Sequence, residues 1–158
     1  MLGEYRGKLF MNKFFSSIKK AYIAGFLDGD GSIYVRLKPN STYKYGFQVA
    51  PYIVFFQSQK SRVNFEKICS MIGLGHLRER NDGILEYIIS KHDAVNVLLK
   101  IIKPYTILKK EQVALMLKIL KQKEKVKSKK DFIKLAELID KFRILNYSKR
   151  RKIRKLTP

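Results

Sequence analysis

Residues 21–32 decide the fold of this chain; they read Ala-Tyr-Ile-Ala-Gly-Phe-Leu-Asp-Gly-Asp-Gly-Ser. Two serines just before this stretch are candidate N-caps, so we expect a helix over about residues 18–27 that Gly29 and Gly31 bring to an end. After it the apolar period changes from 3.6 to 2, which predicts a strand. The stretch therefore joins a helix to a strand through a tight turn that carries two carboxylates.

Those two acids, Asp28 and Asp30, stand out because the chain is strongly basic. It has 34 Lys and Arg against 13 Asp and Glu, a formal net charge of +21. A divalent cation prefers hard oxygen ligands and also contacts phosphate, which gives such a chain a reason to place acids in its tightest turn. A plain Asp-Gly turn is the simpler alternative. The combination indicates a metal-dependent enzyme that acts on nucleic acid.

The composition excludes several classes of protein. At 158 residues, with 46% hydrophobic residues, the chain is long enough for one compact domain. Its charge makes nucleic acid the first candidate partner and an anionic membrane surface the weaker one. Cys69 is the single cysteine, which excludes an internal disulfide and a cysteine-rich zinc site. No apolar run reaches the roughly 20 residues that cross a bilayer, and the N-terminus lacks a signal-peptide core. We expect an intracellular protein, in the cytoplasm of a prokaryote or within an organelle, and not a secreted one.

The apolar periodicity predicts an α+β fold with the order α-β-β-α-β-β-α-α-α. Strands are expected over about residues 32–38, 45–56, 76–80 and 85–90, and further helices over about 62–72, 93–102, 110–121 and 130–145. The strands form two hairpins of one antiparallel four-stranded sheet with helices on one face. Pro51 argues for an edge position or a bulge in the second strand.

The ends of the chain differ from this body, which we place at residues 16–146. Residues 1–15 have no clear period and are expected to be an N-terminal arm. Residues 147–158 form a basic tail whose stretch 149–155 reads Lys-Arg-Arg-Lys-Ile-Arg-Lys. That tail is either solvated or a phosphate-binding arm. Residues 121–130, which are rich in lysine, are expected to be a solvated loop between helices.

The first helix carries a stripe of small residues. Ala21, Gly25 and Gly29 lie at i, i+4 and i+8, so another helix can approach closely. Its partner is either a second copy across a two-fold axis or another part of the same subunit. In the symmetric case Asp30 and its copy meet near the axis, and cations such as Mg²⁺ must neutralise them.

Residues 23–31, Ile-Ala-Gly-Phe-Leu-Asp-Gly-Asp-Gly, resemble the signature of the LAGLIDADG homing endonucleases. The similarity extends from about residue 21 to residue 122. It includes the loop 38–44 and the segments 75–80 and 108–112, which resemble the branch that carries one signature per chain and works as a homodimer. The resemblance implies an α-β-β-α-β-β-α core whose concave sheet surface faces DNA, with additional C-terminal helices.

The resemblance also implies roles for individual residues. Asp30 corresponds to the metal-binding acid, the Gly29 carbonyl to a further ligand, and Mg²⁺ to the cofactor. Gln57 and Lys109 correspond to a glutamine and a lysine that order solvent around the scissile phosphate, so the catalytic set is Asp30, Gln57 and Lys109. A further basic residue is expected four positions after the glutamine, but Ser61 stands there.

Either neighbour of that serine, Lys60 or Arg62, is a candidate for the missing cation. For the dimer interface we expect Ala21, Ala24 and Gly25, with Asp28 capping or bracing it. The residues expected to contact DNA are Tyr34, Arg36, Lys38, Asn40, Tyr43, Gln48, Tyr52, Arg78, Arg80 and Glu86. Among them Arg78 and Arg80 suit bidentate recognition of guanine.

These features favour a site-specific, intron-encoded homing endonuclease. It would act as a homodimer with divalent metal, hydrolysing both strands of a long pseudo-palindromic double-stranded DNA target. We expect no membrane partner and no small-molecule substrate. One alternative is a nucleic-acid binder without nuclease activity, such as a maturase or repressor on the same scaffold. Another is a ribosome-associated basic protein, which leaves the acidic turn unexplained.

Overall fold

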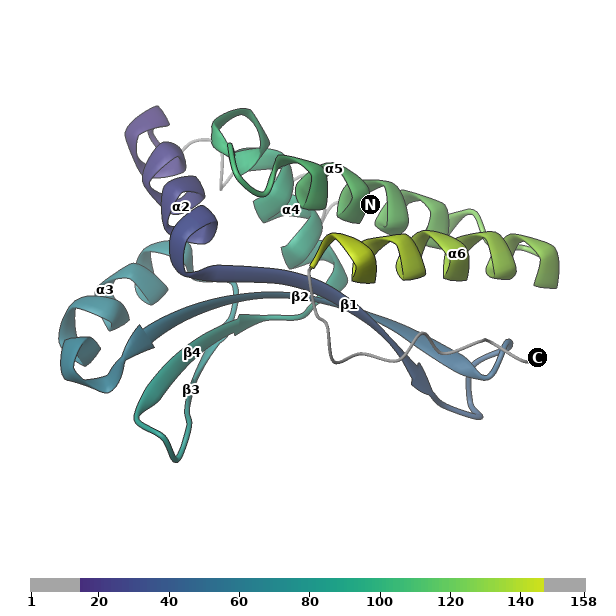
Figure 1. Ribbon diagram of the computed structural model, residues 1–158, viewed down its shortest axis with the longest axis horizontal. Helices are drawn as coiled ribbons and strands as arrows, with labels where there is room; N and C mark the ends of the chain where they lie inside the picture. Colours follow the sequence, from purple (N-terminus) through teal and green to yellow (C-terminus); the bar gives the residue numbers. More distant parts are fainter. Residues whose placement is uncertain (1–14, 147–158) are drawn as a thin grey trace, which may run out of the picture.

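The computed structural model describes residues 15–146, and the expected order of helices and strands is confirmed (Figure 1). The strands are β1 (Gly31–Pro39), β2 (Phe47–Ser58), β3 (His76–Glu79) and β4 (Ile84–Ile89). The helices are α2 (Ser17–Asp30), α3 (Arg62–Ile72), α4 (His92–Ile102), α5 (Lys110–Glu124) and α6 (Lys129–Leu145), with short 3-10 turns η1 (Gln59–Ser61) and η2 (Lys103–Tyr105). The basic tail, and the expected arm except for Phe15, lie outside the described residues.

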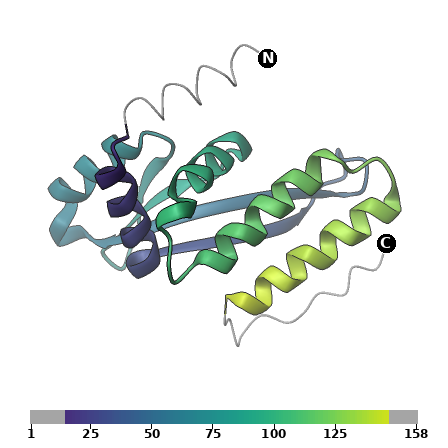
Figure 2. The same ribbon diagram turned by 90° about the horizontal axis from the view of Figure 1, so that it is seen from above.

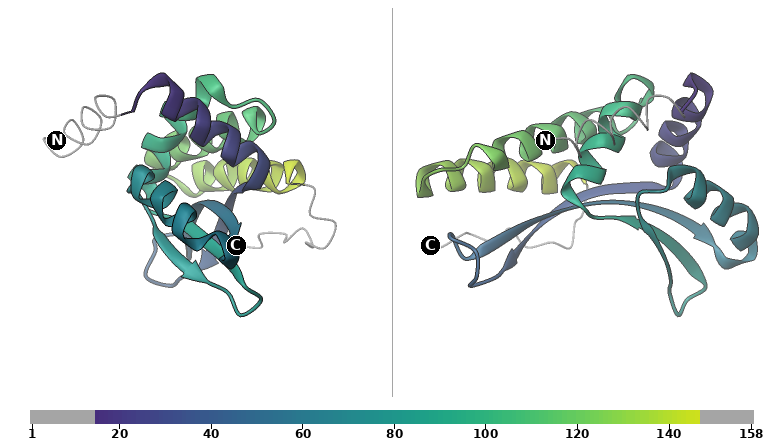
Figure 3. Two further views of the ribbon diagram at one scale, coloured as in Figure 1. Left: turned by 90° about the vertical axis from the view of Figure 1, so that its left-hand side faces the viewer. Right: turned by 180° about the vertical axis from the view of Figure 1, so that it is seen from behind.

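The four strands form one antiparallel sheet in the order β1-β2-β4-β3. The helices all lie over one face of this sheet, and the other face is left open as a concave arch, as the two views of Figure 3 and Figure 1 show. Seen from above, α5 and α6 run side by side over the β1–β2 hairpin, whereas α2 stands at the opposite end (Figure 2). The arch therefore has a long open surface whose one end lies beneath α2.

Pro51 lies in β2, which is a central strand. However, β4 pairs with β2 only from Ile53 onwards, whereas Pro51 has a partner only in β1, Val35. Pro51 is therefore in the part of β2 that has a neighbour on one side, where a residue without an N–H is tolerated. The expected edge position is correct locally, although the strand as a whole is internal.

The core lies between the helices and the covered face of the sheet. In β1 the apolar residues Ile33, Val35 and Leu37 face the helices, as the period of two predicts. Phe15, which the sequence analysis placed in the N-terminal arm, is also buried. Cys69 is buried, and burial raises the pKa of its thiol to about 11.

Two predicted helix ends are wrong. The first helix, α2, does not end near residue 27 but continues through Gly29 to Asp30. Its end is fixed by Gly31, where an added Cβ would lie 2.5 Å from Cδ1 of Leu27 and 2.7 Å from its carbonyl oxygen. The local rule that glycine ends a helix applies to Gly31 and fails for Gly29.

The helix α5 continues to Glu124, so the expected loop 121–130 shrinks to residues 125–128. Val126 packs against the core, and Ser128 with Asp131 forms a capping box that starts α6. At this end Phe132 of α6 stacks on Tyr45 and Phe47, with ring centroids 5.2 and 6.2 Å apart. These rings attach the outer end of the β1–β2 hairpin to the helical layer.

None of the helices within residues 15–146 combines the length and the apolar character that a membrane span requires.

Candidate functional site

Asp30 is the last residue of α2 and is exposed at the end of the arch that lies beneath that helix. Gly31, the next residue, pairs with Phe55, so β2 continues beyond this pair to Gln57 at the same end of the sheet. Strand alternation puts Gln57 on the helix-covered side together with Phe55. Its Oε1 accepts a hydrogen bond from the Ser58 N–H at 2.8 Å.

Lys109 reaches this end from the start of α5. Its Nζ donates to the backbone carbonyl of Asp28 at 2.7 Å, two residues before Asp30. The fold thus brings Lys109, which lies about eighty residues away in the chain, to the last turn of α2. Asp30, Gln57 and Lys109, the three residues expected to be catalytic, all come from elements that meet at one end of the sheet.

Asp28 is engaged within its own subunit. Its Oδ2 accepts the N–H groups of Ile107 and Leu108 at 2.7 and 3.0 Å. Oδ1 accepts the N–H of Lys109 at 3.0 Å. Asp28 therefore braces a loop within its own subunit.

The small-residue stripe of α2 is open. Ala21, Gly25 and Gly29 are exposed, and a Cβ added at either glycine would meet nothing within 4 Å. Tyr22, on the same helix, is also 53% exposed. Ala24, in contrast, is completely buried in the subunit's own core, so its expected place at a dimer interface is wrong. The spacing of four residues identified the stripe of small residues on α2. It did not show that the side chain of Ala24 points into the core of the subunit.

Lys60 and Arg62, the two candidates for the missing cation, lie in different surroundings. Arg62 donates to Glu66 at 3.3 Å and to Glu79, so its charge is compensated and it ties α3 to β3. Lys60 is exposed on η1, and nothing among the described residues pairs with its ammonium group. η1 is fixed because the Gln59 N–H donates to the Gly83 carbonyl at 2.9 Å.

On the β1–β2 half of the open face, aromatic rings hold the cations. Tyr34 and Tyr52 stack with centroids 4.8 Å apart, and Cζ of Arg36 lies 5.1 and 5.7 Å from them. Nζ of Lys38 lies 5.2 Å from the Tyr52 ring and donates to its hydroxyl. Burial raises the pKa of the Tyr34 hydroxyl.

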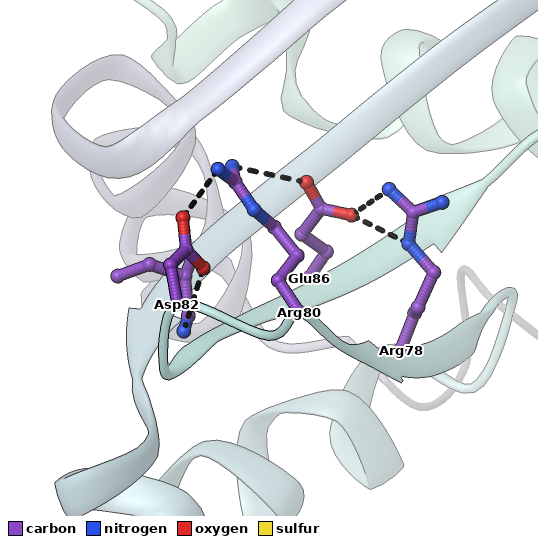
Figure 4. Close-up of polar contacts among 5 residues, drawn as sticks. Arg78, Arg80, Asp82 and Glu86 are labelled. Atoms are coloured by element: carbon purple, nitrogen blue, oxygen red, sulfur yellow. Dashed lines mark hydrogen bonds and ion pairs between the residues drawn. The ribbon is translucent and has the colours of Figure 1, made fainter.

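On the β3–β4 half, carboxylates hold the arginines (Figure 4). Glu86 is only 7% exposed, and it accepts from Nε of Arg78 at 2.8 Å and lies 3.6 Å from Nη1 of Arg80. Arg80 also pairs with Asp82. Glu86 thus orients the two guanidinium groups instead of offering a free carboxylate. The sequence analysis did not identify Asp82 as a partner of Arg80.

The remaining residues expected to contact DNA lie along the β1–β2 hairpin. Oδ1 of Asn40 accepts the Thr42 N–H at 3.0 Å and its hydroxyl at 2.7 Å, which shapes the hairpin turn. Tyr43 is exposed in that turn, and Gln48 lies opposite Lys38. All three therefore belong to the outer half of the arch.

The donors for a metal ion at the end of α2 are few. Helices leave their last carbonyl groups without partners inside the helix. Here the Leu27 carbonyl accepts the Gly31 N–H, and the Asp28 carbonyl accepts Nζ of Lys109. The next carbonyl along the helix is that of Gly29. Within residues 15–146 no group of three or more His, Cys, Asp or Glu side chains could hold a metal ion. A single subunit thus offers one carboxylate and one carbonyl, a set that Mg²⁺ accepts when phosphate and water supply the rest.

Comparison with known proteins gives consistent matches. The sequence model of the family described as LAGLIDADG endonuclease matches residues 23–120. The chain is 34% identical over 132 residues to the DNA endonuclease I-CreI of Chlamydomonas reinhardtii, covering 83% of this chain and 80% of the relative. It is 31% identical over 140 residues to the DNA endonuclease I-CvuI of Chlorella vulgaris, covering 89% and 87%.

Solved structures resemble the fold as well. A crystal structure of the homing endonuclease I-CvuI in complex with its target, in the presence of Ca, has a TM-score of 0.78 at 32% identity, covering 86% of this chain and 87% of that one. Another, with the I-CreI target and Mg and with the DNA not cleaved, has a TM-score of 0.79. An archaeal intron-encoded homing endonuclease, I-Vdi141I, complexed with DNA, shares the fold with a TM-score of 0.75 at 22% identity.

Proposed function

Because the chain belongs to the LAGLIDADG endonuclease family, we propose that it is a homing endonuclease that cleaves both strands of a long double-stranded DNA site as a homodimer. The observation that carries this proposal is that Lys109 is held at the last turn of α2, the turn that ends in the exposed Asp30, at one end of an open, cationic sheet face. A protein that only binds nucleic acid needs the cationic face but neither of those two residues. Because its substrate is DNA, we propose that the protein acts inside the cell, in the cytoplasm of a prokaryote or in an organelle.

The homodimer is supported by the open stripe on α2. Gly25 and Gly29 present bare backbone to solvent, a surface that lets two helices pack closely. A two-fold axis along this stripe places the two copies of Asp30 near each other, at the two helix ends. Two strands of DNA then meet two sites that are related by the same symmetry.

A divalent cation serves this activity, and we propose that it is Mg²⁺. The donor set of Asp30 and the Gly29 carbonyl in each subunit suits an ion that keeps most of its ligands as water and phosphate oxygen. Bound there, such an ion would activate water and stabilise the charge that develops on the phosphate. Because one subunit supplies so few donors, both copies of Asp30 are expected to contribute.

The protein's own polar groups complete the site. Lys109 is half-buried and fixed at the end of α2, so its ammonium group offers a positioned charge near the phosphate. The amide of Gln57 provides both a donor and an acceptor for water at the same end of the sheet. We assign the role of the second cation to Lys60, because Glu66 and Glu79 already compensate the charge of Arg62.

The open face supplies DNA binding, and its length sets the size of the target. β2 has 12 residues, which at ~3.3 Å per residue is roughly 40 Å, or about one helical turn of DNA. A two-fold dimer is therefore expected to recognise a pseudo-palindromic site of about 20 base pairs. Figure 3 shows the curvature that such a groove-following surface requires.

The proposal is tested by incubating the protein with a randomised duplex library and Mg²⁺ and sequencing the cut ends. We expect cleavage on both strands within one pseudo-palindromic motif, and no cleavage in the presence of a chelator. Binding to the library without any cut in Mg²⁺ would contradict the proposal and favour a maturase or repressor. Cleavage without sequence preference would also contradict it.

A further inference from the structure

The carboxylate of Asp28 is the N-terminal cap of a helix far away in the sequence. The N–H groups of Ile107, Leu108 and Lys109 all converge on it, at 2.7, 3.0 and 3.0 Å. α5 begins directly afterwards, and its own N-cap residue, Lys109, makes no side-chain cap hydrogen bond. The first N–H groups of a helix need acceptors, and an anion is favoured there by the helix dipole. Asp28, 79 to 81 residues earlier in the chain, provides that acceptor.

Lys109 is held by the same residue at both of its ends. Its backbone N–H donates to Oδ1 of Asp28, and its Nζ donates to the Asp28 carbonyl at 2.7 Å. A lysine side chain has four rotatable bonds, and ordering it costs rotamer entropy. Here the loop backbone and the ammonium group are fixed by one residue, so the ordering takes place when the protein folds and before DNA binds.

The position of Asp28 links this ordering to the reaction centre. Asp28 lies one helical half-turn before Asp30, on the same rigid helix, so any movement of α2 moves both residues together. Lys109 therefore keeps its place relative to Asp30 although the two come from different elements. A site built on rigid elements with a supporting shell keeps the geometry that catalysis needs.

We propose that Asp28 is a positioning residue that orders Lys109 for phosphodiester hydrolysis. This inference rests on the proposed function, in which Lys109 acts on the phosphate. It assigns to Asp28 neither a metal ion nor a contact with DNA. Asp28 acts through three backbone N–H groups and its own carbonyl.

The first test needs no cleavage. Hydrogen exchange of the amides of residues 107–109 is measured in metal-free protein for wild type, Asp28→Asn and Glu111→Gln. An amide side chain turns an N–H group toward the loop in place of one carboxylate oxygen, so at least one of the three hydrogen bonds is lost. Glu111 is an exposed acid in the first turn of the same helix and serves as a matched control for charge. We expect the amides of residues 107–109 to be protected from exchange in wild type and in Glu111→Gln. In Asp28→Asn this protection should be lost. Unprotected amides in the wild-type protein would overturn the proposal.

The second test is a double-mutant cycle with Asp28→Asn, Lys109→Met and the double variant. It compares single-turnover cleavage rates at saturating protein with DNA affinities. Lys109→Met is expected to slow cleavage by about 10²-fold, the range for one positioned catalytic group. Asp28→Asn should slow it by about 10-fold or more, with nearly unchanged DNA affinity. The double variant should be no slower than Lys109→Met, because Asp28 acts through Lys109.

Independent effects that multiply in the double variant would overturn the proposal, as would a loss of affinity without a loss of rate. If Asp28→Asn does not fold, Asp28→Ser replaces it in both tests, since it keeps a shorter acceptor at the same position. If the wild-type protein cleaves no duplex, the proposed function fails and with it the catalytic role of Asp28. The exchange experiment then shows separately whether Asp28 orders the loop.

Discussion

The end of α2 and the open face of the sheet differ in the groups that hold their functional side chains. At the end of α2, backbone groups fix the loop and Lys109 around Asp28. On the open face, other side chains hold the cations: tyrosine rings beside Arg36, and the Glu86 carboxylate between Arg78 and Arg80.

This difference has a functional meaning. The loop contributes backbone N–H groups to these contacts, so the side chains of residues 107 and 108 are expected to tolerate substitution, whereas Asp28 is not. Contacts between side chains are lost or changed by single substitutions, so the open face can acquire new sequence preferences easily. Cleavage and recognition should therefore respond separately to mutation.

The largest effect is expected for Asp30→Asn. It removes the carboxylate of the metal site, so the cleavage rate should fall by about 10³-fold or more, the loss of several kcal/mol of transition-state stabilisation. DNA binding should remain, or become tighter, because a negative charge near phosphate is lost. Cleavage is measured on the selected target and affinity by fluorescence anisotropy.

Asp93→Asn is the matched control, because Asp93 is an exposed acid at the start of α4, outside both regions. It should leave cleavage and affinity unchanged. Full cleavage by Asp30→Asn would contradict the metal assignment, and a parallel loss of binding would contradict the separation of the two regions.

Gly25→Leu tests whether two subunits pack against each other through α2 and so bring their two copies of Asp30 together. Space is open around this glycine, so a single subunit accommodates leucine and keeps its fold, whereas two closely packed helices cannot. We expect a folded monomer by circular dichroism and sedimentation, with cleavage lost. Ala114→Leu, at an exposed position of α5, is the control and should remain dimeric. A dimeric, active Gly25→Leu would exclude this stripe as the interface.

The sequence predicted the elements well where the signal is local. Both ends of α3 were correct, because apolar residues repeat at helical spacing and Gly73, with φ +65°, ends the helix in the left-handed region. The end of α2 was wrong because packing of the buried Leu27 and the contacts of Asp28 carry the helix past Gly29.

The candidate site was predicted only in part. Resemblance supplied Asp30, Gln57 and Lys109, but the contact of Asp28 with residues 107–109 has no sequence signal, since it joins a carboxylate to backbone groups across about eighty residues. Backbone donors have no residue type that a pattern could identify. Ala24 was misplaced for a related reason, because spacing along a helix does not reveal which side the core occupies.

Lys60→Ala and Arg62→Ala compare two neighbouring cations beside the reaction centre. Lys60→Ala should slow cleavage by about 10²-fold without a change in stability, as for one charge-stabilising group. Arg62→Ala should leave the rate nearly unchanged but lower the free energy of unfolding by about 1 kcal/mol or less, the value of partly exposed ion pairs. Single-turnover kinetics and urea unfolding measure the two quantities. The reverse pattern would make Arg62 the catalytic cation.

The smallest effects are expected on the open face, where Arg80→Ala and Glu86→Gln sharpen the comparison between its two halves. Arg80→Ala should relax base preference at one symmetric pair of target positions, at a cost of ~1–3 kcal/mol. Glu86→Gln removes the charge that orients both Arg78 and Arg80, so it should relax two neighbouring pairs by smaller amounts each. Positions read by the β1–β2 half should change less, because the rings of Tyr34 and Tyr52 hold Arg36 there. Cleavage of a panel of targets with single base-pair substitutions gives these preferences. If Glu86→Gln changed only the position that Arg80→Ala changes, Glu86 would serve Arg80 alone, and Arg78 would be oriented by the DNA.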